Sequence, residues 1–158
     1  MRDAPTIVTA PSALAGTAAA PRPGDLAADG WVDVGGAADV PLLEGREATV
    51  DGRRIAVFRL PSGYAATDAA CPHRGGPLAD GLVADGCVTC PLHNWRLDLT
   101  TGEISGDDAP MALHEVAVVD DRIWVRIAPD AGPAPAPAPR VTAGEAAKLW
   151  GPKGTARA

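Results

Sequence analysis

Two short motifs of cysteine and histidine constrain this fold more than any other feature of the sequence. The first is Cys-x-His at Cys71 and His73, the second is Cys-x-x-His at Cys90 and His93, and sixteen residues separate them. Thiolates and imidazoles are the ligands of iron-sulfur centres and of soft transition metals. The first motif runs into Gly75-Gly76, where the backbone can approach a ligand closely. The chain must therefore fold so that two Pro/Gly-rich loops face each other across a metal centre.

Short apolar or alternating runs surround these motifs, and turn residues separate them at close spacing. Dipeptides typical of tight turns occur at Asp51-Gly52, Asp85-Gly86 and Asp120-Asp121. The predicted strands cover residues 31–34, 48–50, 55–60, 64–67, 87–89, 95–99, 113–119 and 123–127. The pattern predicts one all-β domain over residues 30 to 128, built as an antiparallel sandwich or small barrel.

The two ends of the chain differ in composition from this domain. Residues 1 to 29 are rich in Ala, Pro, Thr and Gly without any period, which predicts a disordered extension. Residues 129 to 158 begin with a Pro/Ala-rich linker, and alternate prolines favour an extended spacer. In the short tail beyond it, Thr142 and Glu145 form a capping-box pattern that would start a two-turn helix, with disorder as the alternative.

Charge and cysteine content exclude several classes of function. The formal charge of -6 and the pI of 4.9 disfavour binding to nucleic acid. No stretch is long and apolar enough to span a membrane, and the N-terminus shows neither an apolar signal core nor a twin arginine, so we expect a cytoplasmic protein without membrane contact. Three cysteines cannot form an even set of disulfides, which favours metal ligation.

The paired motifs resemble those of the Rieske family, and the resemblance covers about residues 31 to 128. It implies an antiparallel β-sandwich of the Rieske type, with a tip of two loops that binds one [2Fe-2S] cluster. Carried over by position, Cys71 and Cys90 would bind one iron, and His73 and His93 the other.

Within that family, the chain is similar to the small subunit of the assimilatory NAD(P)H-dependent nitrite reductase. The similar segments are Cys-Pro-His-Arg-Gly-Gly-Pro-Leu at 71–78, Val-Thr-Cys-Pro-Leu-His-Asn-Trp at 88–95 and Leu-Thr-Thr-Gly-Glu at 99–103. The resemblance implies an electron-transfer subunit that acts in nitrate assimilation beside a large flavin and siroheme subunit. An oxygenase would need a second iron site with two more histidines, and only His114 remains, so no complete substrate site is expected here.

Two alternatives stay open. One is a free Rieske-type ferredoxin that carries electrons from a reductase to an oxygenase. The other is a structural zinc module, for which Cys87 and Cys90 offer a competing pair of thiolates. We expect Cys87 instead to be a small buried thiol, and His114 to be a surface or packing histidine.

Overall fold

The computed structural model describes residues 22–92, 94–106 and 110–136. Strands dominate these residues, and the helices are short. The elements are α1 (Pro23–Ala28), β1 (Val32–Gly36), the 3-10 helix η1 (Ala37–Asp39), β2 (Gly45–Val50), β3 (Arg53–Leu60), β4 (Gly63–Asp68), the 3-10 helix η2 (Leu78–Asp80), β5 (Leu82–Ala84), β6 (Cys87–Thr89), β7 (Arg96–Asp98), β8 (Leu113–Val119) and β9 (Arg122–Arg126).

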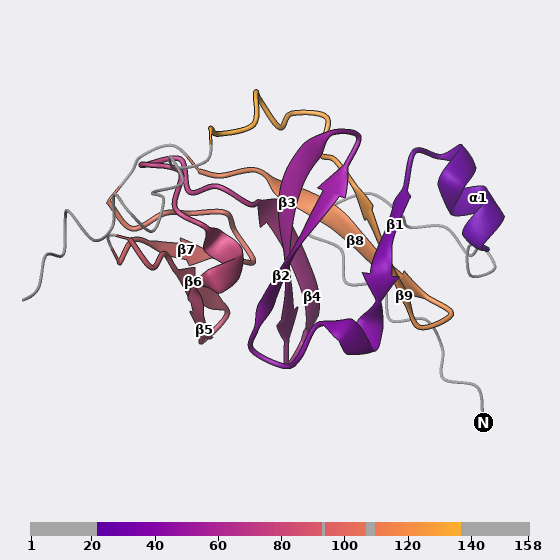
Figure 1. Cartoon of the computed structure of the whole chain (residues 1–158), viewed down its shortest axis with the longest axis horizontal. Helices are drawn as coiled ribbons and strands as arrows, with labels where there is room; N and C mark the ends of the chain where they lie inside the picture. The colour runs from indigo at the N-terminus through magenta and orange to yellow at the C-terminus, as the bar shows by residue number, and fades with distance from the viewer. Residues whose placement is uncertain (1–21, 93, 107–109, 137–158) are drawn as a thin grey trace, which may run out of the picture.

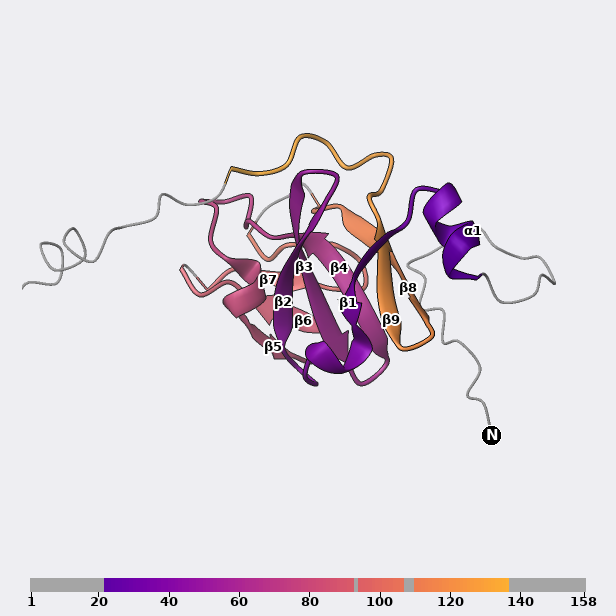
Figure 2. The same ribbon diagram turned by 45° about the vertical axis from the view of Figure 1, so that its right-hand side comes forward.

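The strands form two antiparallel sheets, as the sequence predicts. The larger sheet has six strands in the order β1-β9-β8-β4-β3-β2, and the smaller has three in the order β5-β6-β7. Figure 1 shows the small sheet at one end of the molecule and α1 at the other, and the turned view in Figure 2 keeps this separation. The all-β antiparallel prediction is confirmed. Strand β5 was not predicted.

Three of the tight connections are two-residue turns in which both residues have positive φ. Asp51-Gly52 joins β2 to β3, Asp85-Gly86 joins β5 to β6, and Asp120-Asp121 joins β8 to β9. Asp and Gly tolerate this left-handed backbone, and its twist matches that of the flanking strands. Local turn chemistry therefore fixes the register of three hairpins.

Strand β3 lies between two hydrophobic cores and contributes alternate residues to each. Ala56, Phe58 and Leu60 face a core shared with the small sheet, while Ile55 and Val57 face a second core within the large sheet. Successive side chains of a strand point to opposite faces, so a strand that is buried on both sides is almost continuously apolar. The first core also contains both cysteines of the two motifs, which ties the predicted metal centre to the packing of the small sheet.

Helix α1 lies within the segment that the sequence predicts to be disordered, so the structure differs there. Leu26 is buried beneath it against Trp124, with Ala117, Val119 and Trp31 in the same apolar cluster. A six-residue helix shows no usable period and is stabilised mainly by such a tertiary contact. The rest of the N-terminal extension and the predicted tail helix lie outside the described residues. No helix in the described part of the chain has the length and apolar character needed to cross a membrane.

Candidate metal centre

The two Cys/His motifs adopt the same backbone form. In the first loop, the Cys71 N–H donates to the Gly76 carbonyl (2.8 Å) and the Gly75 N–H donates to the Cys71 carbonyl (2.7 Å). In the second, the Cys90 N–H donates to the carbonyl of residue 95 (2.7 Å) and the Asn94 N–H donates to the Cys90 carbonyl (3.0 Å). The fifth residue of each loop has positive φ, 67° at Gly75 and 59° at Asn94, a region open to Gly and Asn. Each cysteine is thus held at the start of an equivalent hydrogen-bonded turn.

The two turns bring the Cys71 and Cys90 thiols together beneath the surface. Both residues are buried, and the two side chains are within hydrogen-bonding reach of each other. Burial raises the pKa of the Cys71 thiol to about 11, while the backbone N–H groups of His73 and Arg74 act against this rise by donating to the sulfur. A buried pair of neighbouring thiols ionises only with difficulty unless a cation compensates the charge. The arrangement is the one needed by two thiolates that share a metal centre.

Gly76 lies where the backbone of the first loop contacts the second loop. A Cβ atom at this residue would lie 2.6 Å from Sγ of Cys90 and 3.2 Å from Cδ1 of Leu92. Only glycine leaves room there, and the sequence prediction that the glycines allow a close approach holds for Gly76. Gly75 closes the turn of the first loop, where its N–H donates to the Cys71 carbonyl. The close approach of the first loop's backbone to the buried Cys90 thiol, together with the Cys/His donors, fits an iron-sulfur centre held between the two loops.

His73, the third predicted ligand, is half-buried on the first loop. Its ring stacks on the indole of Trp95, with 4.1 Å between the ring centroids and 17° between the planes. The fourth predicted ligand, His93, lies outside the described residues. No group of three or more Cys, His, Asp or Glu side chains able to hold one metal ion occurs within the described ranges. A two-iron centre takes two protein ligands on each iron, so it needs no such group.

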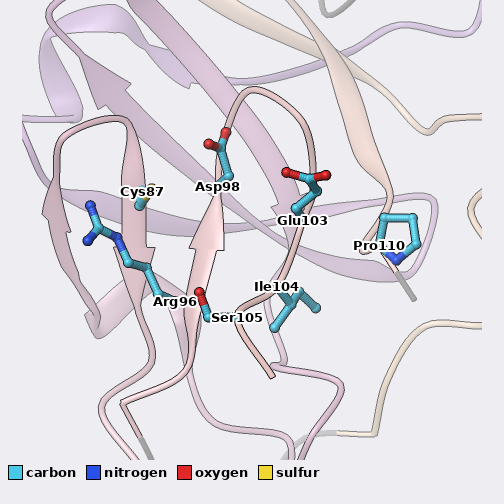
Figure 3. Close-up of a pocket in the computed structure, with 7 residues that line it drawn as sticks. All are labelled: Cys87, Arg96, Asp98, Glu103, Ile104, Ser105 and Pro110. Atoms are coloured by element: carbon cyan, nitrogen blue, oxygen red, sulfur yellow. The ribbon is translucent and has the colours of Figure 1, made fainter. Parts of the chain in front are cut away.

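Cys87 lies apart from this centre. The burial pattern of β6 places Val88 and the following Cys90 towards the core and leaves Cys87 half-buried on the opposite face. Cys87 lines an open pocket of about 670 Å³ together with Arg96, which hydrogen-bonds to it. Figure 3 shows this pocket, whose other lining residues are Asp98, Glu103, Ile104, Ser105 and Pro110. Cys87 and Cys90 point to opposite faces, which counts against the competing zinc pair, and Cys87 is less buried than predicted.

His114 is a packing histidine, one of the two roles that the sequence predicts for it. It is buried on β8, its Nδ1 accepts the Ala128 N–H (3.4 Å), and its Nε2 lies 3.4 Å from Oδ1 of Asp68. Because Nδ1 is an acceptor, the neutral ring carries its proton on Nε2 and donates to Asp68. Asp68 also binds Arg53, so this network stabilises the large sheet and belongs to no ligand site.

Comparisons with known proteins also indicate an iron-sulfur domain. A family model described as the Rieske [2Fe-2S] domain matches residues 30–118. The anthranilate 1,2-dioxygenase ferredoxin subunit of Burkholderia cepacia is 35% identical over 83 residues, 51% of this chain and 77% of that protein. Cholesterol 7-desaturase nvd 1 of Ciona intestinalis is 40% identical over 72 residues, 44% of this chain. The chain spans only 15% of the desaturase, so that similarity concerns one part of a larger protein.

A solved structure with a related fold is described as a small subunit of an NADPH nitrite reductase. It superposes with a TM-score of 0.55 and is 26% identical, covering 60% of this chain and 96% of that subunit. The part of this chain that matches is thus almost the whole of that small protein.

Proposed function

The chain belongs to the Rieske [2Fe-2S] domain family, and we propose that it is the electron-transfer subunit of an NAD(P)H-dependent nitrite reductase. The cofactor of the family is one [2Fe-2S] cluster, which when bound takes up and releases one electron at a time. The observation that carries the proposal is the pair of equivalent turns that brings the buried Cys71 and Cys90 thiols together.

In this proposal, Cys71 and Cys90 hold one iron, and His73 and His93 hold the other. The backbone N–H groups of His73 and Arg74 donate to the Cys71 sulfur and favour its thiolate form. Burial in the core of the small sheet keeps water from both sulfurs. Leu92, on the second loop, is about half exposed (48%), and the electron would leave the centre past this loop.

The choice of nitrite reductase depends on two observations. The first is the sequence from Val88 to Trp95, which is similar to the small subunit of that enzyme. The second is the match to nearly the full length of a nitrite reductase small subunit. The substrate site would then lie on a large cytoplasmic partner that carries flavin and siroheme.

A second candidate is a ferredoxin that feeds an oxygenase. It is favoured by the 35% identity with the anthranilate 1,2-dioxygenase ferredoxin subunit, which the chain matches over 77% of its length. Both candidates need the same cluster and differ in the proteins that donate and accept the electron.

The test has two stages. Purified protein should be brown and contain about two irons and two acid-labile sulfides per chain. Stoichiometric zinc without visible absorption would overturn the cluster assignment and favour the structural module. The cluster should then be reduced by NADH or NADPH in the presence of a nitrite reductase large subunit. Reduction only by the reductase of an aromatic-ring dioxygenase would instead establish the ferredoxin role.

A further inference from the structure

Trp95 contacts both loops of the metal centre, each through a different part of the residue. Its carbonyl accepts the Cys90 N–H (2.7 Å) and so closes the turn of the second loop. Its indole stacks on the His73 ring of the first loop, with the centroids 4.1 Å apart. One residue therefore joins the backbone that holds Cys90 to the side chain of His73, a histidine 22 positions earlier in the sequence.

The two turns have the same backbone hydrogen bonds but differ in the side chain at one position. Gly76 and Trp95 occupy the same position, since each supplies the carbonyl that accepts the N–H of its own cysteine. In the first loop this position has no side chain, because a Cβ would lie 2.6 Å from Sγ of Cys90. In the second loop it carries the largest side chain available, and that side chain extends to His73. At this position the first loop brings its backbone against Cys90, and the second loop brings an indole against His73.

Two further contacts restrict the indole of Trp95. Trp95 is half-buried and packs against the core of the small sheet. The backbone at Gly106 approaches its six-membered ring, where a Cβ would lie 3.8 Å from Cε2 and 3.9 Å from Cζ2. A ring held in this way has little freedom to turn, so the face that it presents to His73 is fixed by the core.

We propose that Trp95 is a positioning residue that fixes the ring plane of His73 and shields that ring from water. This inference rests on the proposed function, because it takes His73 as an iron ligand. An imidazole on an exposed loop can rotate about its side-chain bonds, and a stacked partner selects one orientation. Groups that orient a ligand in this way control both metal retention and the properties of the metal.

The shielding has a predictable effect on the reduction potential. Two ferric ions, two sulfides, two thiolates and two neutral imidazoles sum to about zero charge, and an added electron makes the reduced centre negative. Water stabilises the charged state more than the neutral one. Loss of the indole should therefore admit water beside His73 and raise the potential.

The experiment compares Trp95→Met, Trp95→Phe and Trp31→Phe in cluster-loaded protein. Methionine keeps apolar volume without a flat ring, and phenylalanine keeps a ring that can stack. Trp31 is a matched control, because it is half-buried, packs against the cluster of Leu26 and Trp124, and has its ring 4.9 Å from the Arg126 guanidinium. Helix α1, which carries Leu26, lies at the opposite end of the molecule from the small sheet (Figure 1). The readouts are the EPR g values of the reduced protein, the reduction potential, the rate of iron loss to a chelator and the thermal unfolding midpoint.

W95M should shift the g values, raise the potential and lose iron about 10-fold faster. W95F should restore most of each property, and W31F should resemble the wild type. The inference is overturned if folded W95M keeps the g values and potential of the wild type. It is equally overturned if W95F and W95M are affected alike and iron loss simply follows thermal stability, since Trp95 would then only pack the core. A wild-type protein without iron would refute the proposed function itself.

Discussion

A Cβ atom added at Gly76 would lie 2.6 Å from Sγ of Cys90, so the backbone of the first loop passes directly over the thiol of the second. We predict that Gly76→Ala disrupts the centre, because the new methyl group overlaps a buried sulfur whose neighbours are packed in the core. Overpacking of this kind costs about 1–3 kcal/mol, and here the shift falls on a proposed ligand. Iron content per chain and the thermal unfolding midpoint should both fall.

Gly132→Ala is the control for that substitution. No atom lies within 4 Å of a Cβ at this residue. Its iron content and unfolding midpoint should match the wild type. Full iron occupancy and unchanged stability in G76A would mean that the loops do not need this close approach.

The three cysteines should separate into two groups. Cys71→Ser and Cys90→Ser should lose the visible absorption and unfold at lower temperature, because metal-binding free energy is coupled to folding. Cys87→Ser should keep iron and colour, since Cys87 faces the pocket beside Arg96 on the other side of β6. Iron analysis and absorption spectra check this, and a colourless C87S protein would contradict the assignment of the pair.

The sequence predicts those parts of the fold that depend on neighbouring residues. Two-residue turns such as Asp51-Gly52 and Asp85-Gly86 require positive φ, and the residue types that permit it are visible in the chain. Strand β8 matches its predicted range because seven residues are enough to show the pattern. The close backbone approach at Gly76 follows from the same local reasoning, because a glycine near a predicted metal ligand indicates such an approach.

The remaining features depend on residues distant in sequence. Leu26 stabilises α1 only because Trp124 lies beneath it, and no pattern near Leu26 indicates that partner. Asp68 contacts His114, a residue 46 positions away. The stacking of His73 on Trp95 is of the same kind, since it exists only after the loop that follows β4 and the loop between β6 and β7 have met. An aromatic residue two positions after the second motif is the single signal that could have suggested it.

Arg74 allows a test of docking at the tip of the two loops. Its side chain is exposed, and its contribution to the centre is a backbone N–H that donates to Cys71. Arg74→Glu should therefore leave absorption and iron content unchanged. If the tip is the docking face, electron transfer with the partner should slow by about 10-fold at low salt, because charge reversal at an interface rim acts mainly on association.

Arg46→Glu is the matched control for this prediction, since it reverses a charge on β2 within an exposed pair with Glu44. Stopped-flow measurements across a range of salt concentrations should show an altered salt dependence for R74E only. Equal rates for both variants would exclude the tip as the docking face.

The buried carboxylate of Asp68 should dominate the acid stability of the large sheet. Burial opposes its ionisation, but hydrogen bonds from His114 and Arg53 outweigh this effect, so the pKa of Asp68 is lowered. Asp68→Asn leaves Arg53 without its carboxylate partner. The pair is largely buried, since the Arg53 side chain is 15% exposed and the Asp68 side chain 5%. Breaking a buried pair of this kind costs about 3–5 kcal/mol. Urea unfolding at neutral pH should show a loss of that order.

The pH dependence gives the sharper test of the same carboxylate. Because the folded pKa lies below that of the unfolded chain, the stabilisation is complete above about pH 4 and is lost as the pH falls through the folded pKa. The difference in unfolding free energy between the wild type and D68N should therefore be constant near neutral pH and shrink in acid, and comparison at each pH cancels losses common to both proteins. Asp33→Asn removes a similar but more exposed pair with Arg122 (31% and 51%), and its effect should be much smaller and sensitive to salt. A D68N difference that stays constant down to pH 3 would show that Asp68 stabilises the sheet through its shape and hydrogen bonds and not through its charge.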